Sequence, residues 1–156
     1  MATYSQYQPQ KNDNFKTPIE VWNNIKQYIP KDKKIWCPFY FNGEHTLKDL
    51  GYDIIHEDKD FFTYEPDEYD IIIDNPPFSI KKQVLQRLKV INKPFILIMP
   101  VSTICYKYFK SYKDEIQIII PPKRYNFAPE LKSSPSFDCL YYCYKMNLSK
   151  DIIFIN

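Results

Sequence analysis

Glycine is scarce in this chain of 156 residues: only 2 glycines are present, against 13 prolines, 14 tyrosines and 11 phenylalanines. The GxGxxG fingerprint of dinucleotide-binding enzymes needs three glycines, so the scarcity argues against an enzyme of that kind. Histidine is equally scarce, with 2 residues. Neither His45 nor His56 has a Ser or Cys partner at a recognisable spacing, so we expect both to be structural or loop residues.

Long apolar runs are also lacking. No stretch approaches the roughly 20 apolar residues of a membrane span. The polar N-terminal stretch has no apolar core of the kind found in a secretory signal. We therefore expect a flexible N-terminal arm over residues 1–14, a single domain over residues 15–156, and no association with a membrane.

The four cysteines include no CxxC pair. Cys37 and Cys105 lie in or beside apolar runs, and Cys139 and Cys143 are four residues apart, on one face of an expected strand. Buried free thiols explain this pattern better than a metal site or a disulfide, which are the alternatives. We therefore expect a reducing compartment, the cytoplasm, or the host cytoplasm if the protein is viral.

The charges are unevenly divided along the chain. Residues 1–75 contain 8 Lys and Arg against 14 Asp and Glu, whereas residues 76–156 contain 13 against 5. A basic half of this kind favours a polyanionic partner such as a nucleic acid. A solvated surface without a partner is the alternative explanation.

Apolar runs typical of buried strands alternate along the chain with helical patterns. This alternation predicts an α/β fold with a mostly parallel central sheet, helices on both faces and a C-terminal β-hairpin. Thr17 and Ser79 are expected to cap the first and third helices. The strands are expected at 34–37, 52–56, 69–73, 95–100, 115–120, 136–145 and 151–156, and the helices at 18–29, 44–50, 80–91 and 101–112.

Three of the expected strands are followed by chemically unusual segments. The segments are PFYFNG at 38–43, HEDKD at 56–60 and DNPPF at 74–78. Ligands of open α/β sheets bind outside the carboxyl ends of the strands. We therefore expect the three segments to converge on one cleft.

The strongest chemical signal is Asn75-Pro76-Pro77-Phe78, which follows a continuous apolar run. Two consecutive prolines fix two φ angles and remove two backbone donors, so the loop is stiff. Asn75 Oδ1 and the Pro76 carbonyl can each accept one N–H of a planar amino group, while Phe78 stacks on the attached ring. No strong general base is needed, because the proton can leave after the nitrogen has become positive. A plain Pro-Pro turn that closes a strand is the alternative.

This motif is similar to the (Asp/Asn)-Pro-Pro-(Tyr/Phe) signature of amino-group methyltransferases, above all the DNA adenine-N6 methyltransferases. Over residues 15–146 the chain resembles a compact member of bacteriophage or large-virus type. The resemblance implies a Rossmann-like class I methyltransferase fold and S-adenosyl-L-methionine as cofactor. It also implies inline transfer of a methyl group to the N6 amino group of adenine, with Asn75, Pro76, Pro77 and Phe78 as the catalytic residues.

Further segments match the family in the same order. Phe15 and Thr17 resemble an N-terminal segment that helps to hold the methionine part of the cofactor. Pro38, Phe39 and Gly43 resemble the cofactor loop after the first strand. That loop departs from the family pattern, because Cys37 stands where an acid is expected and a second glycine is missing.

The acidic segment after the second strand also resembles the family. A carboxylate there, Glu57 or Asp58, would accept the ribose hydroxyls, as in dinucleotide-binding folds. Asp60 and Phe61 resemble a family pair in which the carboxylate takes the adenine amino group of the cofactor and the ring packs on its face. Asn75 is expected to contact the cofactor as well. A solvated acidic turn is the alternative explanation for these residues.

The segment 122–127 follows a strand and is expected to bind the substrate. In the family an aromatic ring in this region stacks on the extruded base, and Phe127 is the first choice here, with Tyr125 as the alternate. Lys123 and Arg124 could hold phosphates. A plain surface turn is the alternative.

The resemblance leaves several functions open. Loops of this type also serve RNA adenine or guanine-N2 methylation and glutamine methylation in proteins. A methyltransferase fold without activity, used as a binding subunit, is a further alternative. The expected partner is DNA, with RNA as the alternate. Either target specificity is low, or recognition comes from loops near residues 102–113 and 122–136, from a partner subunit or from a homodimer.

Overall fold

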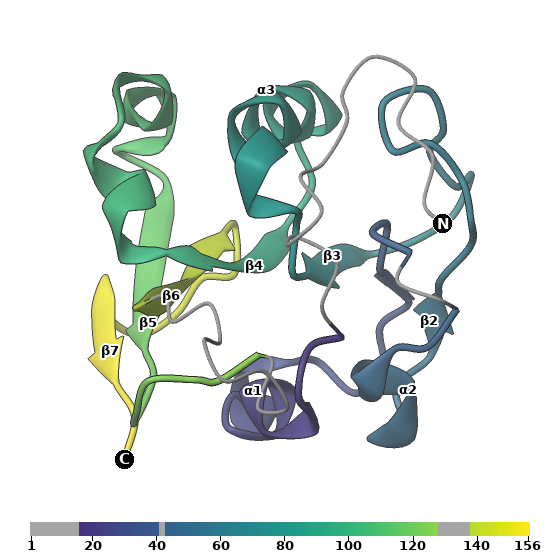
Figure 1. Ribbon diagram of the computed structural model, residues 1–156, viewed down its shortest axis with the longest axis horizontal. Coiled ribbons are helices and arrows are strands. Elements are labelled where there is room, and N and C mark those ends of the chain that lie inside the picture. Colours follow the sequence, from purple (N-terminus) through teal and green to yellow (C-terminus); the bar gives the residue numbers. More distant parts are fainter. Residues whose placement is uncertain (1–15, 41–42, 128–137) are drawn as a thin grey trace.

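The protein is built on one seven-stranded mixed sheet in the strand order β2-β1-β3-β4-β6-β5-β7 (Figure 1). The computed structural model describes residues 16–40, 43–127 and 138–156. The strands are β1 (Ile35–Trp36), β2 (Ile54–Ile55), β3 (Ile71–Asp74), β4 (Phe95–Pro100), β5 (Ile116–Ile120), β6 (Cys139–Tyr144) and β7 (Ile152–Phe154). The α-helices are α1 (Ile19–Asn23), α2 (Thr46–Asp49) and α3 (Lys81–Ile91). The 3-10 turns are η2 (Lys26–Tyr28), η3 (Phe78–Ile80), η4 (Val101–Cys105) and η5 (Lys107–Tyr112).

The expected α/β fold with a Rossmann-like sheet is confirmed. Strands β2, β1, β3 and β4 pair in parallel, whereas β6 pairs antiparallel with both β4 and β5. The edge strand β7 pairs in parallel with β5. The chain runs outward from β1 to β2 and then returns to place β3 on the other side of β1. This reversal of strand order creates the switch point at which open α/β sheets bind their ligands.

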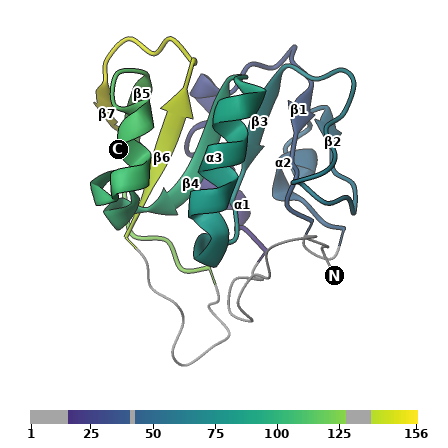
Figure 2. The same cartoon turned by 90° about the horizontal axis from the view of Figure 1, so that it is seen from above.

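Two hydrophobic cores lie on opposite faces of the sheet. Helix α3 and the η4–η5 segment cover one face, and α1 and α2 cover the other (Figures 1 and 2). Side chains alternate between the two faces along a strand. In β4, Phe95, Leu97 and Met99 join the core under α3, while Ile96 and Ile98 join the core over α1. Burial on both faces explains why this strand is a continuous apolar run.

Several local expectations are wrong. The first helix ends at Asn23, and Pro18 precedes it in place of a capping Thr17 side chain. Ser79 lies inside η3, and the residue that precedes α3 is Ile80, without a side-chain cap. Thr17 and Ser79 therefore do not cap helices.

The expected helix at 101–112 is two 3-10 turns, separated by the extended residue Tyr106. β-Branched and aromatic residues, which are poor helix formers, dominate this segment. Cys105 within it is exposed, contrary to the expectation that every thiol is buried, whereas Cys37, Cys139 and Cys143 are buried. Among the described residues, no helix is long and apolar enough to span a membrane.

Candidate active site

The carboxylate of Asp74 is the centre of a hydrogen-bond network at the carboxyl end of β3. Its Oδ2 accepts the backbone N–H of Phe39 at 2.8 Å, and its Oδ1 accepts the backbone N–H of Asn75 at 2.8 Å. His45 Nε2 donates to Oδ1 at 3.0 Å, because His45 Nδ1 accepts the Leu47 N–H and leaves the proton on Nε2. Because Asp74 is 1% exposed, these three donors offset the free-energy cost of burying its carboxylate. The network ties the loops after β1 and β3 together at the switch point.

The side chain of Asn75 is held from the opposite direction. Its Nδ2 donates to Thr17 Oγ1 at 3.0 Å, and Thr46 Oγ1 in turn donates to the Thr17 carbonyl at 2.9 Å. Its Oδ1 is buried and has no hydrogen-bond partner within the part of the chain that the structure describes. A buried acceptor without a donor costs free energy unless a ligand supplies the donor. Asn75 Oδ1 is therefore positioned to accept a hydrogen bond from a ligand.

The corner that contains Asn75 is largely buried. Asn75 is 6% exposed, and Pro76 and Pro77 are buried as well. Phe78 is half-buried and packs against the core over α1. A substrate would therefore reach the corner from the side of Phe78.

The loop after β1 approaches itself closely at Gly43. Gly43 has φ +78°, and a Cβ added there would lie 2.5 Å from Tyr40 Oη. The left-handed backbone therefore favours glycine at this position, and any larger residue would also force the end of the Tyr40 side chain to shift. Pro38 and Phe39 of the same loop are buried, and the Phe39 ring contacts Phe61 with ring centroids 5.1 Å apart.

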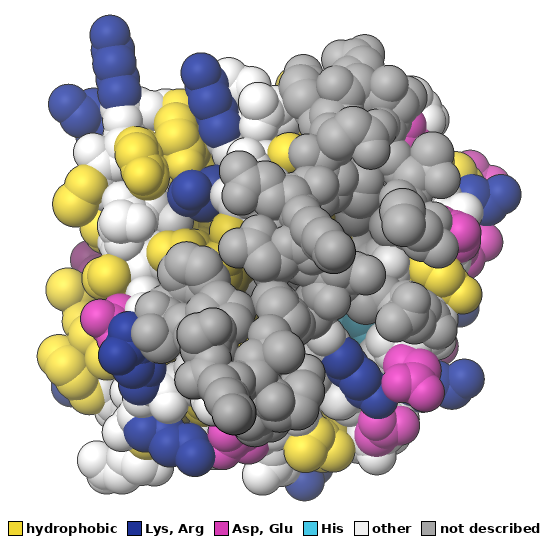
Figure 3. Space-filling view, in the orientation of Figure 1, with side chains coloured by type: hydrophobic (Ala, Val, Ile, Leu, Met, Phe, Trp, Pro, Cys, Tyr) yellow, Lys and Arg dark blue, Asp and Glu magenta, His cyan; other side chains and the backbone are white. Residues whose placement is uncertain are grey.

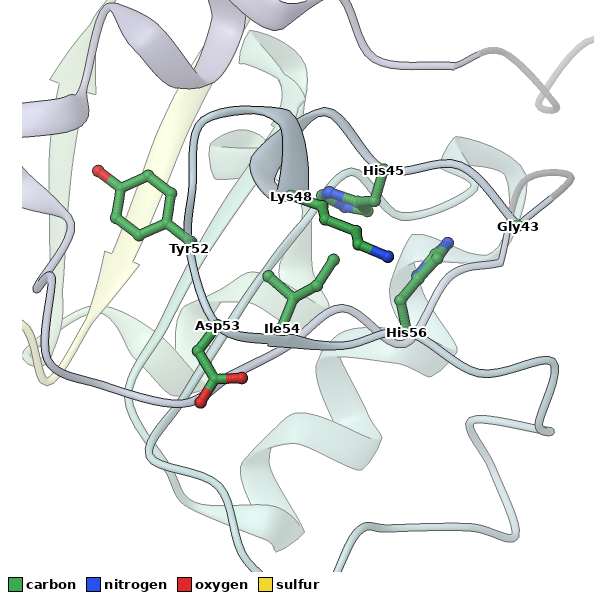
Figure 4. A pocket seen from close by; sticks show the side chains of 7 residues that line it. All are labelled: Gly43, His45, Lys48, Tyr52, Asp53, Ile54 and His56. Atoms are coloured by element: carbon green, nitrogen blue, oxygen red, sulfur yellow. The ribbon is translucent and has the colours of Figure 1, made fainter.

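A pocket of about 250 Å³ opens between this loop, α2 and β2 (Figure 4). The rings of His45 and His56 meet edge to face at 5.0 Å, and the Lys48 side chain extends from α2 toward His56. Of the predicted cofactor residues, Gly43 lines this pocket. The lining residues are Gly43, His45, Lys48, Tyr52, Asp53, Ile54 and His56.

His56 presents a second buried acceptor. Its Nδ1 lies 2.9 Å from the Cys37 carbonyl, which can only accept, so Nδ1 carries the proton and Nε2 is a bare acceptor. Nε2 is buried and has no partner among the residues described. Burial lowers the pKa of His56 below its ordinary value, so the ring is neutral at physiological pH. Burial, and then the Asp74 charge, raise the pKa of Cys37 and keep its thiol protonated.

The acidic segment after β2 turns mostly to solvent. Glu57 and Asp58 are exposed, and Glu57 Oε1 accepts the Tyr64 hydroxyl at 2.9 Å. Asp60 is half-buried and its Oδ1 accepts the Phe62 N–H at 2.9 Å. None of the three is among the residues that line the pocket. Their contact with a cofactor stays a prediction.

Phe61 is fully buried, in the core under α3. Its ring contacts Phe39 at 5.1 Å and Trp36 at 5.6 Å between centroids. The ring therefore packs between β1 and the loop that follows it, and this packing helps to hold the loop in place. A direct contact with a cofactor ring stays a prediction.

The aromatic residues expected to stack on the target base lie in the core over α1. Tyr125 is 2% exposed and Phe127 is 6% exposed. The Tyr125 hydroxyl accepts from Asn24 Nδ2 at 2.8 Å and shares a 2.6 Å hydrogen bond with the Tyr141 hydroxyl. A stacking role for either ring would require it to leave this packing, and it stays a prediction.

Lys123 and Arg124 are exposed and form ion pairs. Lys123 pairs with Glu20 at 2.9 Å, and Arg124 pairs with Asp138 at 3.0 Å. Exposed pairs of this kind are weak, so a phosphate could compete with them. Phe15, the remaining predicted cofactor residue, lies outside the described residues.

Two features of the site were missed by the sequence reasoning. Asp74 was read only as part of the loop motif, although it organises both loops. The sequence predicts a structural or loop residue at His56, whereas its ring lines the pocket and its buried Nε2 has no partner among the described residues. Their positions could have identified both residues. Asp74 ends a parallel strand and His56 directly follows one, at the edge of the sheet where ligands bind.

The cofactor implied by the resemblance fits the chemistry of this edge. The buried acceptor among the residues that line the pocket, His56 Nε2, needs a donor. S-adenosylmethionine has an ammonium, two ribose hydroxyls and an adenine amino group, all of them donors. Lys48 lines the pocket and could pair with the carboxylate of such a cofactor. The residues present therefore fit the group.

Comparisons with known proteins give distant matches only. No model of a protein family matches the chain, and no curated protein matches it. Among solved structures, a type I restriction-modification system methyltransferase subunit from Streptococcus thermophilus is 13% identical, with a TM-score of 0.47 over 95% of this chain. A predicted O-methyltransferase from Agrobacterium tumefaciens is 11% identical, with a TM-score of 0.35 over 78% of this chain. The chain spans 46% of the first protein and 65% of the second.

Proposed function

We propose that the protein is an S-adenosylmethionine-dependent methyltransferase that acts on the exocyclic amino group of a nucleic-acid base, N6 of adenine in DNA. The observation that carries the proposal is the amide of Asn75. Its Nδ2 is anchored to Thr17, and its Oδ1 is a buried acceptor with no partner among the described residues. That oxygen is matched to one N–H of a planar amino group.

The neighbouring residues add the second half of the binding geometry. Two prolines follow Asn75 and fix the backbone, so the Pro76 carbonyl is held in place as another acceptor. Phe78 is half-buried beside them and offers a ring to a flat base. Two rigid acceptors orient the amine and hold its lone pair in one direction, which is catalysis by positioning.

The remaining residues hold the corner in place. Asp74 ties the loops after β1 and β3 together, and Thr17 fixes the Asn75 amide. His45, His56 and Lys48 would hold the cofactor in the pocket beside them. S-adenosylmethionine, when bound, supplies a methyl group on a positively charged sulfur. The amine nitrogen would gain this methyl group as the S–C bond breaks, the sulfur would keep the electron pair of that bond, and the amine proton would then pass to solvent.

The proposal is tested by methyl transfer from labelled S-adenosylmethionine to DNA, RNA and protein. We expect transfer to DNA, with N6-methyladenine recovered after digestion. Asn75→Ala should lower the rate at least a hundredfold while S-adenosylmethionine binding changes little. Asn23→Ala, an exposed asparagine in α1, is the matched control and should behave as the unaltered protein. Methyl transfer by Asn75→Ala at the rate of the unaltered protein would refute the proposal. Transfer to RNA alone or to protein alone would show that DNA is not the substrate.

The burial of the corner favours a second candidate, a methyltransferase fold that binds partners without catalysing transfer. With Asn75 only 6% exposed, a base must displace the residues that cover the amide. Calorimetry with S-adenosylmethionine separates the two candidates. Binding at micromolar to millimolar concentrations supports the enzyme, whereas no binding at millimolar concentration supports the silent subunit.

A further inference from the structure

A long stretch of the chain beside the catalytic corner has no acidic residue. Residues 75–113 contain eight lysines and arginines and neither Asp nor Glu. These residues form the corner, α3, β4 and the η4–η5 segment, and α3 lies beside η5 on the same face of the sheet (Figure 1). The acid-free stretch therefore places lysines on the surface of two neighbouring elements, α3 and η5, and of these Lys89 pairs with Glu115.

The charges at the corner end of this surface have no ion pair within the part of the chain described. Lys81 and Lys82 lie in the first turn of α3, and Lys107 and Lys110 lie on η5, where no salt bridge to an acid is formed. Helix α3 has no side-chain cap and no acid in its first turn. Cations at the positive end of a helix are unfavourable in isolation, and a bound anion would offset this cost.

A stacked aromatic pair, the exposed Tyr106 and the half-buried Tyr108, lies on the same surface. The rings of Tyr106 and Tyr108 stack with centroids 5.3 Å apart and planes 10° from parallel. Lys81 Nζ lies 5.1 Å from the centre of the Tyr106 ring, and the same ammonium donates to the Phe78 carbonyl at 3.3 Å. One lysine thus links the catalytic corner to the aromatic pair.

Apolar side chains surround this pair on the surface. Val101, Ile104 and Tyr106 are 43%, 43% and 46% exposed. In Figure 3, yellow hydrophobic and blue basic side chains occupy the part of the surface over α3 and the η4–η5 segment, and no acidic side chain is visible there. An exposed apolar patch with a basic rim marks a binding surface.

From these features we propose that the first turn of α3 and residues 101–110 bind single-stranded nucleic acid, and that this surface delivers the target base to Asn75. The inference rests on the proposed function for the identity of the target site. Lysines on the surface take the phosphates, and an unpaired base takes the face of the Tyr106 ring that Lys81 Nζ now covers, so that the displaced ammonium can pair with a phosphate. Flat aromatic rings beside a basic groove are the usual platform for single strands, because every unpaired base offers a face.

The binding constant for a labelled, mixed-sequence, single-stranded DNA of 15 nucleotides tests the surface. It is measured by fluorescence anisotropy without S-adenosylmethionine. Tyr106→Leu keeps apolar area but removes the ring, and we expect it to weaken single-strand binding about tenfold, in line with the value of one stacked base. Tyr106→Phe keeps the ring and should bind as the unaltered protein. The same 15-mer as a duplex should bind more weakly than the single strand.

The charge part of the proposal has its own variants. The double substitution K82E/K107E should weaken binding and flatten the salt dependence of the binding constant by about 1.4 in logarithmic slope, since each lost phosphate contact contributes about 0.7. K31E/K33E makes the same change of charge on exposed lysines that precede β1, and it should have a much smaller effect. Thermal unfolding of each variant confirms that it is folded.

The outcomes separate this inference from the proposed function. If Tyr106→Leu binds as the unaltered protein, or K82E/K107E loses no more than K31E/K33E, the surface does not bind nucleic acid and suits a protein partner instead. Duplex binding that equals single-strand binding would also overturn the inference. If the variants weaken single-strand binding as expected but the protein transfers no methyl group, the surface binds nucleic acid and the proposed enzymatic function is refuted. Methyl transfer at a rate that Tyr106→Leu and K82E/K107E do not change supports the proposed function and overturns the inference about this surface.

Discussion

Asp74 Oδ2 accepts the backbone N–H of Phe39 at 2.8 Å, so the carboxylate that ends β3 holds the loop that follows β1. The contact joins residues that are 35 positions apart in the sequence. It forms at the point where the strand order reverses, which is where a ligand of this fold would bind.

Asp74→Asn should destabilise the protein and loosen both loops. An amide offers one acceptor and adds two donors, so at least one of the three N–H groups that now face the carboxylate loses its partner. We expect the free energy of unfolding to fall by about 2–3 kcal/mol, the cost of a lost hydrogen bond to a buried charged group. Urea unfolding measures the loss. Asp67→Asn, an exposed aspartate, is the control, and equal stability of the two variants would contradict the role of Asp74.

Thr17→Val tests how the Asn75 amide is held. Valine has nearly the same shape but no hydroxyl, so Asn75 Nδ2 loses the acceptor 3.0 Å away. We expect methyl transfer to fall at least tenfold, because the amide can then rotate away from the orientation that presents Oδ1. Stability should fall by about 1–3 kcal/mol. Thr17→Ser keeps the hydroxyl, and its activity should stay within a few-fold of the unaltered protein. If Thr17→Val is fully active, Thr17 does not position Asn75.

The pKa of His56 predicts a pH dependence of stability. Burial lowers this pKa below its ordinary value of 6.5, so the folded ring binds a proton less readily than the unfolded ring. The unfolded state therefore gains protons first as the pH falls, and the free energy of unfolding should decrease below about pH 6.5. Urea unfolding at steps between pH 7.5 and 5.5 measures the slope.

His56→Gln is the matched variant for this slope, because glutamine does not titrate. Its free energy of unfolding should change less over the same pH range. The same substitution removes the bare acceptor Nε2, and calorimetry should show weaker binding of S-adenosylmethionine at pH 7.5. An unchanged pH slope would show that His56 does not titrate differently in the folded and unfolded states.

Tyr125→Phe tests the role of the Tyr125 hydroxyl in the core. The variant keeps the ring but loses the hydroxyl that joins Asn24 and Tyr141. We expect the free energy of unfolding to fall by about 1–2 kcal/mol, with methyl transfer unchanged at a temperature where the variant is folded. Tyr28→Phe, on a half-buried tyrosine, is the control. The stacking hypothesis for residues 125 and 127 gains support if Phe127→Leu lowers methyl transfer without loss of stability.

The alternation of strands and helices and the stiffness of the corner after β3 could be read from the sequence because both depend on local pattern. The run Ile71–Ile73 is apolar throughout because β3 is buried on both faces, and Asn75-Pro76-Pro77 is stiff because proline fixes its own backbone. Helix ends were less predictable. Thr17 has the chemistry of a cap, but its hydroxyl is engaged by Asn75, 58 residues away.

The sequence by itself determined the alternation that makes an α/β sheet, the rigid corner after β3 and the acid-free basic stretch, since each is a property of neighbouring residues. The tertiary structure alone decided which of those residues meet. It buried Tyr125 and Phe127 in the core, turned Glu57 and Asp58 to solvent, and brought Asp74, His45 and Phe39 together. Such contacts depend on how parallel strands far apart in the chain align, and hydrogen bonds across that distance leave no period in the sequence.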